Sequence, residues 1–188
     1  MSSRSLPSPW RPSPLPAGFS AIELMAAIAI AAILMAMAMP SFGTLIGRYR
    51  LRHAADDLSA AIYLARSEGL RRGGNVTLGR SAAQGCSSTG GDKDWSCGWL
   101  VFADADNDGA FDPGEERIQV WTTPQGVTAT AILPNQSAHL SVNRWGRFQN
   151  LSAFRFEFGL ASDQDKAAAR VLCISSGGRL RNVDGDRC

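Results

Sequence analysis

The longest apolar segment of the chain runs from Leu24 to Gly47 and contains no charged residue. Its 24 residues exceed the roughly 20 that an α-helix needs to cross the ~30 Å hydrocarbon core of a bilayer. A helix that is apolar on every side lies in a membrane or inside an assembly. The pattern therefore predicts a membrane-spanning helix over residues 19–47, in which Pro40 is expected to kink or locally melt the helix.

After Arg48 the helical pattern continues, but only one face stays apolar. The apolar positions recur every three or four residues, at Leu51, Ala55, Leu58, Ile62, Ala65 and Gly69. Two arginines and two glycines at residues 71–74 are typical of a helix C-terminus. One long helix is therefore predicted from about Phe19 to Arg72, and its second half should pack on a sheet.

The remainder of the chain alternates short apolar segments with turn residues, which predicts strands. The predicted strands are Val76–Leu78, Trp99–Ala103, Arg117–Trp121, Val127–Leu133, His139–Val142, Phe154–Phe158, Arg170–Ile174 and Arg179–Val183. Phe154, Phe156 and Phe158 alternate with polar residues, as in an antiparallel sheet with one buried face. A long helix followed only by strands predicts an α+β fold, with the helix packed on antiparallel β-sheets.

Length and charge narrow the functional classes only slightly. The net charge of the 188 residues is +2, which favours no class of partner. Residues 92–117 carry eight acidic and two basic side chains, whereas residues 144–188 carry five acidic and eight basic ones. Residues 48–188 are enough for one globular domain. No GxSxG, HExxH or Walker motif is present, and neither His53 nor His139 has an evident partner, so we predict no enzymatic activity.

Four cysteines all lie beyond the apolar helix, which suits a domain in an oxidising compartment such as the periplasm. Three pairings are possible. We predict Cys86–Cys97 and Cys173–Cys188, because each pair closes a loop rich in Gly, Ser and Asp. A zinc site is the alternative, but the CxxC spacing is missing and the histidines are remote in sequence.

Glu23 is a carboxylate near the start of the apolar helix. It either lies at the membrane surface, where the positive end of the helix dipole stabilises it, or waits for a cation of a neighbouring subunit, such as a free α-amino group. The sequence alone favours neither of these two roles.

The segment GFSAIELMAAIAIAAIL, residues 18–34, resembles the class III signal and N-terminal helix of type IV pilins and type II secretion pseudopilins. The resemblance implies cleavage after Gly18 by the prepilin peptidase, N-methylation of Phe19 and a role for Glu23 in subunit assembly. A proline in the position of Pro40 is also common in that family.

This resemblance implies a domain organisation. Residues 1–18, which are rich in Ser and Pro, would be a cleaved leader without regular structure, residues 19–47 the transmembrane and assembly helix, and residues 48–188 a periplasmic globular domain. The mature protein would be a single-pass protein of the bacterial inner membrane with a type IV pilin-like fold. Its partners would be other pilins or pseudopilins, with which it enters a pilus or pseudopilus.

Four later segments narrow the resemblance to the GspH/FimT branch of minor pilins. They are ARSEGLRRG from Ala65, VTLGR from Val76, GWLVFADADNDGAFDPGEE from Gly98, and GRLR at residues 178–181. The last segment, with Gly178, Arg179 and Arg181, matches the GRxR motif with which FimT-type pilins of naturally competent bacteria bind DNA. The resemblance thus implies a minor pilin that captures DNA for transformation. The alternative is a purely structural, GspH-like minor pseudopilin of the type II secretion system.

The basic C-terminal segment can also be assessed from its residues alone. In an extended chain Arg179 and Arg181 point to the same side, about 6.6–6.8 Å apart, close to the spacing of successive phosphates along a nucleic-acid strand. Further candidates for phosphate contact are Arg187, Arg144 and Arg147. Asp184 and Asp186 lie close by and weaken the positive field. The alternative is an edge strand that carries charge to prevent aggregation.

Residues 104–115 fit the D-x-D-x-D-G-x5-E calcium-loop pattern at every defined position, through Asp104, Asp106, Asp108, Asp112 and Glu115. The flanking segments are predicted strands and not helices, so the alternative is an acidic hairpin loop whose Asn, Asp and Gly residues form turns. No cofactor is predicted, and Ca²⁺ remains a candidate ligand only.

Four tryptophans could stack on bases of single-stranded DNA. We expect Trp95, Trp99 and Trp121 to lie in the core, and leave the role of Trp145 open.

Overall fold

The structure is a computed structural model that describes residues 18–81, 91–134, 138–149, 152–161, 170–185 and 187–188, without the side chains of residues 36–42 and 44. Residues 1–17, most of the predicted leader, lie outside the described residues. The chain divides into two compact units, residues 1–42 and 43–188.

Helix α1 extends from Ala21 to Arg72, within two residues of the predicted bounds. A capping box starts it: the Ser20 backbone N–H donates to the Glu23 carboxylate (3.2 Å), and the Glu23 N–H donates to the Ser20 hydroxyl (3.3 Å). The backbone stays helical through Pro40, so the helix does not melt there; a proline removes only one backbone hydrogen bond, which the flanking turns tolerate.

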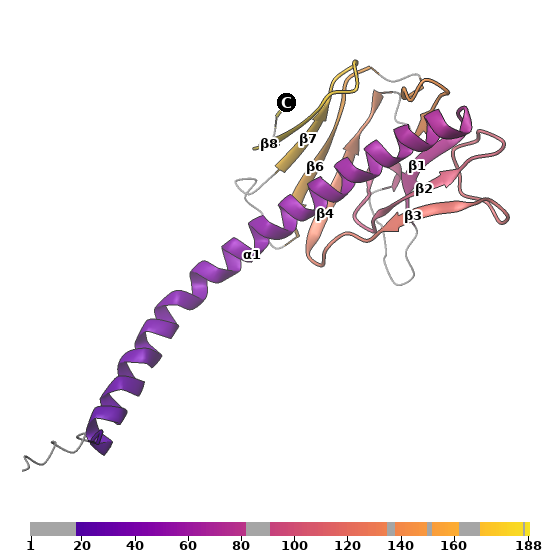
Figure 1. Ribbon diagram of the computed structural model, residues 1–188. Helices are drawn as coiled ribbons and strands as arrows, with labels where there is room; N and C mark the ends of the chain where they lie inside the picture. Colours follow the sequence, from indigo (N-terminus) through magenta and orange to yellow (C-terminus); the bar gives the residue numbers. More distant parts are fainter. Residues whose placement is uncertain (1–17, 82–90, 135–137, 150–151, 162–169, 186) are drawn as a thin grey trace, which may run out of the picture. The chain divides into compact units, whose positions relative to one another are not determined.

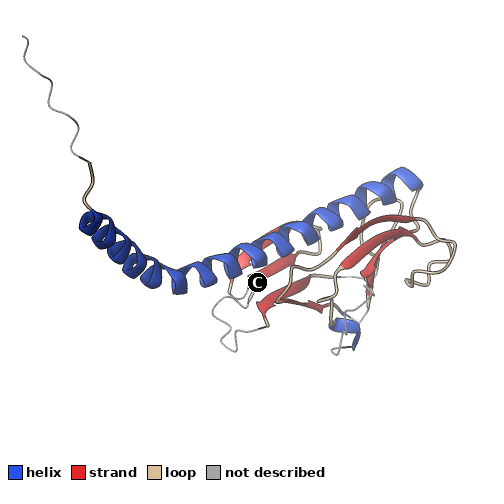
Figure 2. Cartoon of the chain, turned by 90° about the horizontal axis from the view of Figure 1, so that it is seen from below, coloured by secondary structure: helices blue, strands red, loops and turns tan. Residues whose placement is uncertain are grey.

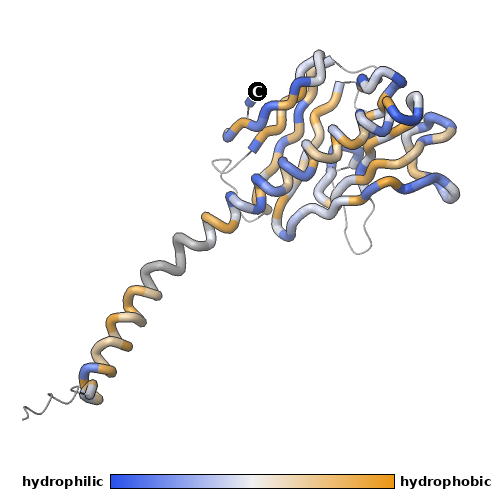
Figure 3. Tube along the Cα trace, viewed as in Figure 1, coloured by the Kyte–Doolittle hydropathy of each residue, from blue (hydrophilic) through white to orange (hydrophobic). Residues whose placement is uncertain are grey.

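The first unit contains most of the apolar segment of α1, whose described side chains are coloured mainly as hydrophobic in Figure 3. Large side chains there are exposed, including Phe19, Ile22 and Met25. No helix in the described part of the chain meets the length and apolarity required to cross a bilayer.

Eight strands within the described residues form two four-stranded antiparallel sheets. The first has the order β3-β2-β1-β5, with β1 Val76–Arg80, β2 Trp99–Ala103, β3 Arg117–Trp121 and β5 His139–Val142. The second has the order β4-β6-β7-β8, with β4 Val127–Ile132, β6 Phe154–Leu160, β7 Arg170–Ile174 and β8 Leu180–Asp184. A short 3-10 helix, η1, covers Gly91–Lys93. Each predicted strand is present, displaced by at most two residues at an end.

In the second unit, α1 packs along one side of both sheets (Figures 1 and 2). The predicted apolar face is buried throughout, at Leu51, Ala55, Leu58, Ile62, Ala65 and Gly69. Gly69 allows the helix to approach β5 closely, because a Cβ at this position would lie 2.6 Å from Cγ1 of Val142. The chain therefore has the predicted α+β architecture.

The aromatic residues complete the core as expected. Trp95, Trp99 and the three alternating phenylalanines of β6 are buried, and Trp121 is half-buried against them. Trp145, in contrast, is 70% exposed. Burial of each large apolar side chain contributes about 1.5–3 kcal/mol, so this shared core holds the helix to both sheets.

Candidate functional site

The GRLR motif spans the end of the tight turn after β7 and the first two residues of the edge strand β8; we call residues 175–181 the C-terminal basic turn. The Gly178 N–H donates to the Ser175 carbonyl (2.8 Å), and the Ser175 N–H donates to the Arg179 carbonyl (3.1 Å). Gly178 has a φ of 78°, a conformation that favours glycine. The first residue of the motif is therefore required by the backbone of the turn.

Arg66 of α1 connects this turn to a second one, residues 143–147. Its Nη1 donates to the Gly178 carbonyl (3.0 Å), and its Nε donates to the Gly146 carbonyl (2.9 Å). One guanidinium thus holds both turns side by side and brings Arg144 and Arg147 next to the C-terminal basic turn. The sequence does not single out Arg66, because its two partners lie 80 and 112 residues away along the chain.

The arginines of the two turns are exposed, and most of their side chains have no acidic partner. Within the described residues, no hydrogen bond or ion pair involves the side chains of Arg147, Arg179 or Arg181. The Arg144 guanidinium lies 5.7 Å from the centre of the exposed Trp145 ring. These cations are therefore available to an external anion.

The expected weakening by nearby acids is smaller than the sequence implied. Asp184 forms an ion pair with Arg170 of β7 at 2.7 Å, which offsets its charge. Asp186 lies outside the described residues. The field at the C-terminal basic turn is therefore less opposed by Asp184 than its position in the sequence indicated.

Cys173 and Cys188 form a disulfide, with 5.7 Å between their Cα atoms, which confirms this predicted pair. Cys173 lies opposite Arg181 of β8 in the sheet register, so the bond attaches the end of the chain beside Arg181. It also rules these two cysteines out as zinc ligands. Arg187 is exposed but has an interaction partner. Cys86 lies outside the described residues, so the pair with Cys97 stays a prediction.

A pocket of about 620 Å³ opens beside the C-terminal basic turn. Its lining consists of Ile132, Leu133, Pro134, Ser152, Ala153, Phe154, Arg155, Cys173, Ile174, Ser175, Arg179, Arg181 and Cys188. Arg155 is paired with Glu157 at 2.9 Å, which leaves Arg179 and Arg181 as the available cations. Guanidiniums beside an apolar wall suit an anion that carries an apolar part, such as a phosphate with its attached sugar and base.

The predicted calcium loop, residues 104–115, connects β2 to β3. Asp104 is fully buried; its Oδ2 accepts hydrogen bonds from the Thr77 hydroxyl (2.7 Å) and the Gly109 N–H (3.1 Å). The Glu115 carboxylate accepts hydrogen bonds from the backbone N–H groups of Ala105 (2.9 Å) and Asp112 (3.0 Å). The acidic side chains thus build the conformation of their own loop.

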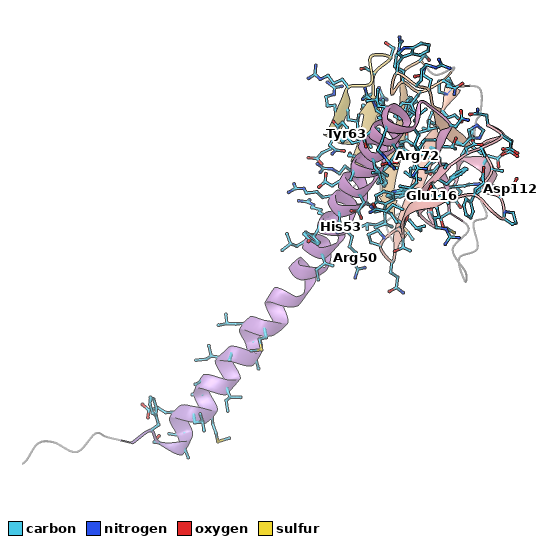
Figure 4. The ribbon with its side chains drawn as sticks, turned by 45° about the vertical axis from the view of Figure 1, so that its right-hand side comes forward. Arg50, His53, Tyr63, Arg72, Asp112 and Glu116 are labelled. Atoms are coloured by element: carbon cyan, nitrogen blue, oxygen red, sulfur yellow. A yellow bond between two sulfur atoms is a disulfide. The ribbon has the colours of Figure 1, made fainter. Side chains whose placement is uncertain are left out.

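The negative charges of this loop are crowded. Asp112, labelled in Figure 4, lies in the second half of the loop. Desolvation, followed by the charges of Asp108 and Asp106, raises the pKa of Asp112 above its ordinary value of 3.8. Gly109 has a φ of 81°, and a Cβ at this position would overlap the ring of His139, so both the turn and the packing require glycine.

Ion pairs tie the end of α1 to the residue that follows this loop. Arg72 donates to both carboxylate oxygens of Glu116 (2.7 and 2.8 Å; Figure 4) and to Glu68 (2.8 Å). Hydrogen bonds from Arg71 and then Arg72 lower the pKa of Glu68 to about 2. No local pattern in the sequence predicts this network, because Glu116 lies 44 residues from Arg72.

His53 has a partner that the sequence analysis missed. Its Nδ1 lies 2.8 Å from Oδ2 of Asp57, one helical turn away. The expectation that His53 has no partner is therefore wrong, and the four-residue spacing was the signal.

Comparisons with known proteins agree with this architecture. The family model described as "Type II transport protein GspH" matches residues 54–178. No curated protein sequence matches the chain. Two crystal forms of the type IV minor pilin FimU of Pseudomonas aeruginosa superpose with TM-scores of 0.53 and 0.50, at 23% and 22% identity. Each alignment covers 71% of this chain, and 88% or 92% of the FimU chain.

A third solved structure is the minor pseudopilin EpsH from the Type 2 Secretion System of Vibrio cholerae. It aligns with a TM-score of 0.48 and 13% identity, over 72% of this chain and 97% of EpsH. The likeness to FimU shows the predicted pilin-like fold.

Proposed function

The chain belongs to the GspH family, and from this premise we propose that it is a minor pilin that assembles into a type IV pilus and holds DNA on its C-terminal basic turn. Family membership and the pilin-like fold support a role as a minor pilin or minor pseudopilin. Assembly, membrane insertion and DNA capture are the proposed refinements.

We propose that the prepilin peptidase cleaves after Gly18 and that Phe19 becomes the N-methylated first residue. Gly18 and Phe19 are exposed and precede the first turn of α1. The apolar surface of α1 in the first unit needs lipid or neighbouring helices to cover it. Inner-membrane insertion, with the domain in the periplasm, followed by transfer into the filament meets this need, and the Cys173–Cys188 disulfide suits that compartment.

We propose that Glu23 pairs with the α-amino group of a neighbouring pilin, with Pro40 in the same assembly helix. Glu23→Gln is the informative variant, because Gln keeps the capping box with Ser20 but removes the charge. We expect reduced incorporation into filaments, measured by immunoblot of sheared pili. Ser20→Ala, which weakens the cap and keeps the carboxylate, should incorporate normally. Normal incorporation of Glu23→Gln would exclude the charge pairing.

The DNA-binding proposal rests on one observation: Arg179 and Arg181 are exposed and unpaired within the described residues, on a turn fixed by Arg66 and close to a disulfide. Guanidiniums bind phosphates in a bidentate manner. Gly178 shapes the turn, Arg144 and Arg147 extend the basic surface, and Arg187 lies near the disulfide. Contacts to phosphates carry no sequence information, so binding should be non-specific.

The test is a titration of the full chain, in detergent, with fluorescent duplex DNA at several salt concentrations. The logarithm of the affinity should fall with log salt by roughly 0.9 per phosphate neutralised. The double variant Arg179→Gln and Arg181→Gln should reduce this slope by up to about two. Arg48→Gln with Arg52→Gln removes the same charge from exposed positions of α1 and is the matched control.

Two results would contradict DNA binding by this turn: no binding of the parent chain at low salt, or equal losses in the two double variants. In a host that takes up DNA, the Arg179 and Arg181 variant should also lower the transformation frequency. This second readout distinguishes phosphate binding in solution from a role in natural competence.

The alternative is a structural minor pseudopilin of the type II secretion system. The description of the matched family as a type II transport protein favours it. A parent chain that does not bind DNA, together with impaired assembly of Glu23→Gln, would support this alternative.

A further inference from the structure

We propose that the loop between β2 and β3 is a calcium site, with Asp104, Asp106 and Asp108 as its protein ligands. One carboxylate oxygen from each of these residues can be chosen such that all lie within 4.8 Å of one another. Such a cluster of acids is common on protein surfaces without an ion, so the proposal depends on the environment of Asp104.

Asp104 is fully buried, and its two oxygens are used unequally. Oδ2 accepts both hydrogen bonds, from Thr77 and Gly109, whereas Oδ1 is buried and has no hydrogen-bond donor. Of the buried side-chain atoms without a partner in the described part of the chain, it is the sole acceptor. A buried carboxylate oxygen without a partner is unfavourable, and a bound cation would satisfy it.

The surrounding loop offers no positive charge of its own. Among the described residues, no Arg or Lys forms an ion pair with Asp104, Asp106 or Asp108. Asp106 and Asp108 each accept one hydrogen bond from a loop N–H group, in both cases at Oδ1. Their second oxygens are therefore not committed to these bonds.

The chemistry of the donors selects the ion. Carboxylate oxygens favour hard divalent cations over zinc or copper. Ca²⁺ accepts six to eight oxygens in an irregular arrangement, whereas Mg²⁺ requires a near-ideal octahedron. Asp106 and Asp108 are exposed, so water would complete the coordination shell of the ion. Asp112 and Glu115 lie further along the same loop. Calcium sites of extracellular modules have dissociation constants on the order of 10⁻⁴–10⁻³ M, and we expect this range here, given the proposed location of the domain outside the cytoplasm.

The experiment is calorimetric titration of the full chain, in detergent and free of metal, with CaCl₂ and separately with MgCl₂. We expect a dissociation constant for Ca²⁺ of about 10⁻⁴–10⁻³ M and binding of Mg²⁺ at least about tenfold weaker. The melting temperature should rise in 10 mM CaCl₂ (about 10 or more times the expected constant) relative to EGTA, because binding to the folded state stabilises it.

The variants locate the ion. Asp106→Asn and Asp108→Asn alter exposed side chains and should preserve the fold, while each raises the dissociation constant about tenfold or more by removing a charged ligand. Asp92→Asn removes an exposed acid outside the loop and should leave it unchanged. Equal melting temperatures in CaCl₂ and EGTA without heat of binding, unchanged affinity in the two loop variants, or equal affinity for Mg²⁺ would each overturn the proposal.

Discussion

The loop between β2 and β3 and the C-terminal basic turn both connect consecutive antiparallel strands and both concentrate one sign of charge. They are built in opposite ways. In the acidic loop the motif residues shape the backbone: Asp104 is buried, and Glu115 bonds loop N–H groups. In the basic turn, Arg179 and Arg181 extend from a backbone that Arg66 holds from outside. The motif side chains of the acidic loop therefore form the conformation of the loop itself, whereas the arginines of the basic turn extend from a backbone that is held by another element.

The largest expected effect tests this difference directly. Asp104→Ala should lower the free energy of unfolding by about 2–4 kcal/mol, because it removes two hydrogen bonds to a buried carboxylate and leaves the Thr77 hydroxyl with one fewer partner. Arg181→Gln should change it by less than about 0.5 kcal/mol, as for an exposed residue without partners. Urea unfolding of both variants gives the two values, and equal values would refute the contrast.

A second prediction concerns how the basic turn is held. Arg66→Ala should cost about 1–2 kcal/mol, because it removes two hydrogen bonds from a half-buried guanidinium to backbone carbonyls. It should also weaken DNA binding, since the two basic turns lose their common support. Arg52→Ala, at an exposed position of the same helix, is the control for stability. Unchanged unfolding and DNA affinity of Arg66→Ala would show that the turns hold their positions without it.

The smallest expected effect involves the support of the acidic loop from α1. The pKa of Glu68 is lowered to about 2 from 4.5, so its ion pairs contribute stability above pH 4.5 that is lost as the pH falls toward 2. The loss should be on the order of 1 kcal/mol or less, because water screens such pairs. Glu68→Gln should remove this part of the pH dependence. Thermal unfolding between pH 2 and 6 measures it, and identical curves for parent and variant would contradict the prediction.

The helix and the strands could be predicted from local sequence patterns. The three- and four-residue spacing of α1 from Leu51 to Gly69 and the alternation at Phe154, Phe156 and Phe158 report which side of each element faces the core. The capping box at Ser20 and Glu23 also follows from a local pattern, a serine three residues before a glutamate, which was interpreted above only for the charge of Glu23. Features that depend only on residues close together in the sequence can therefore be predicted without a structure.

The candidate site was only partly predictable. GRLR and the acidic motif were identified as sequences, and the Cys173–Cys188 pair followed from its short loop. The role of Arg66 was not, because Gly178 lies 112 residues away. Nor could the sequence tell that Asp184 is paired with Arg170, across two strands.

The sequence by itself determined the long helix, the eight strands, the buried faces and the charged motifs, because each depends on periodicity or spacing within a few residues. Only the tertiary structure decided that the strands divide into two sheets, that one guanidinium joins two basic turns, and that Asp104 is buried with an unpartnered oxygen. These features depend on contacts between segments distant in the chain, which hydrogen bonding and close packing select and which leave no local pattern to read.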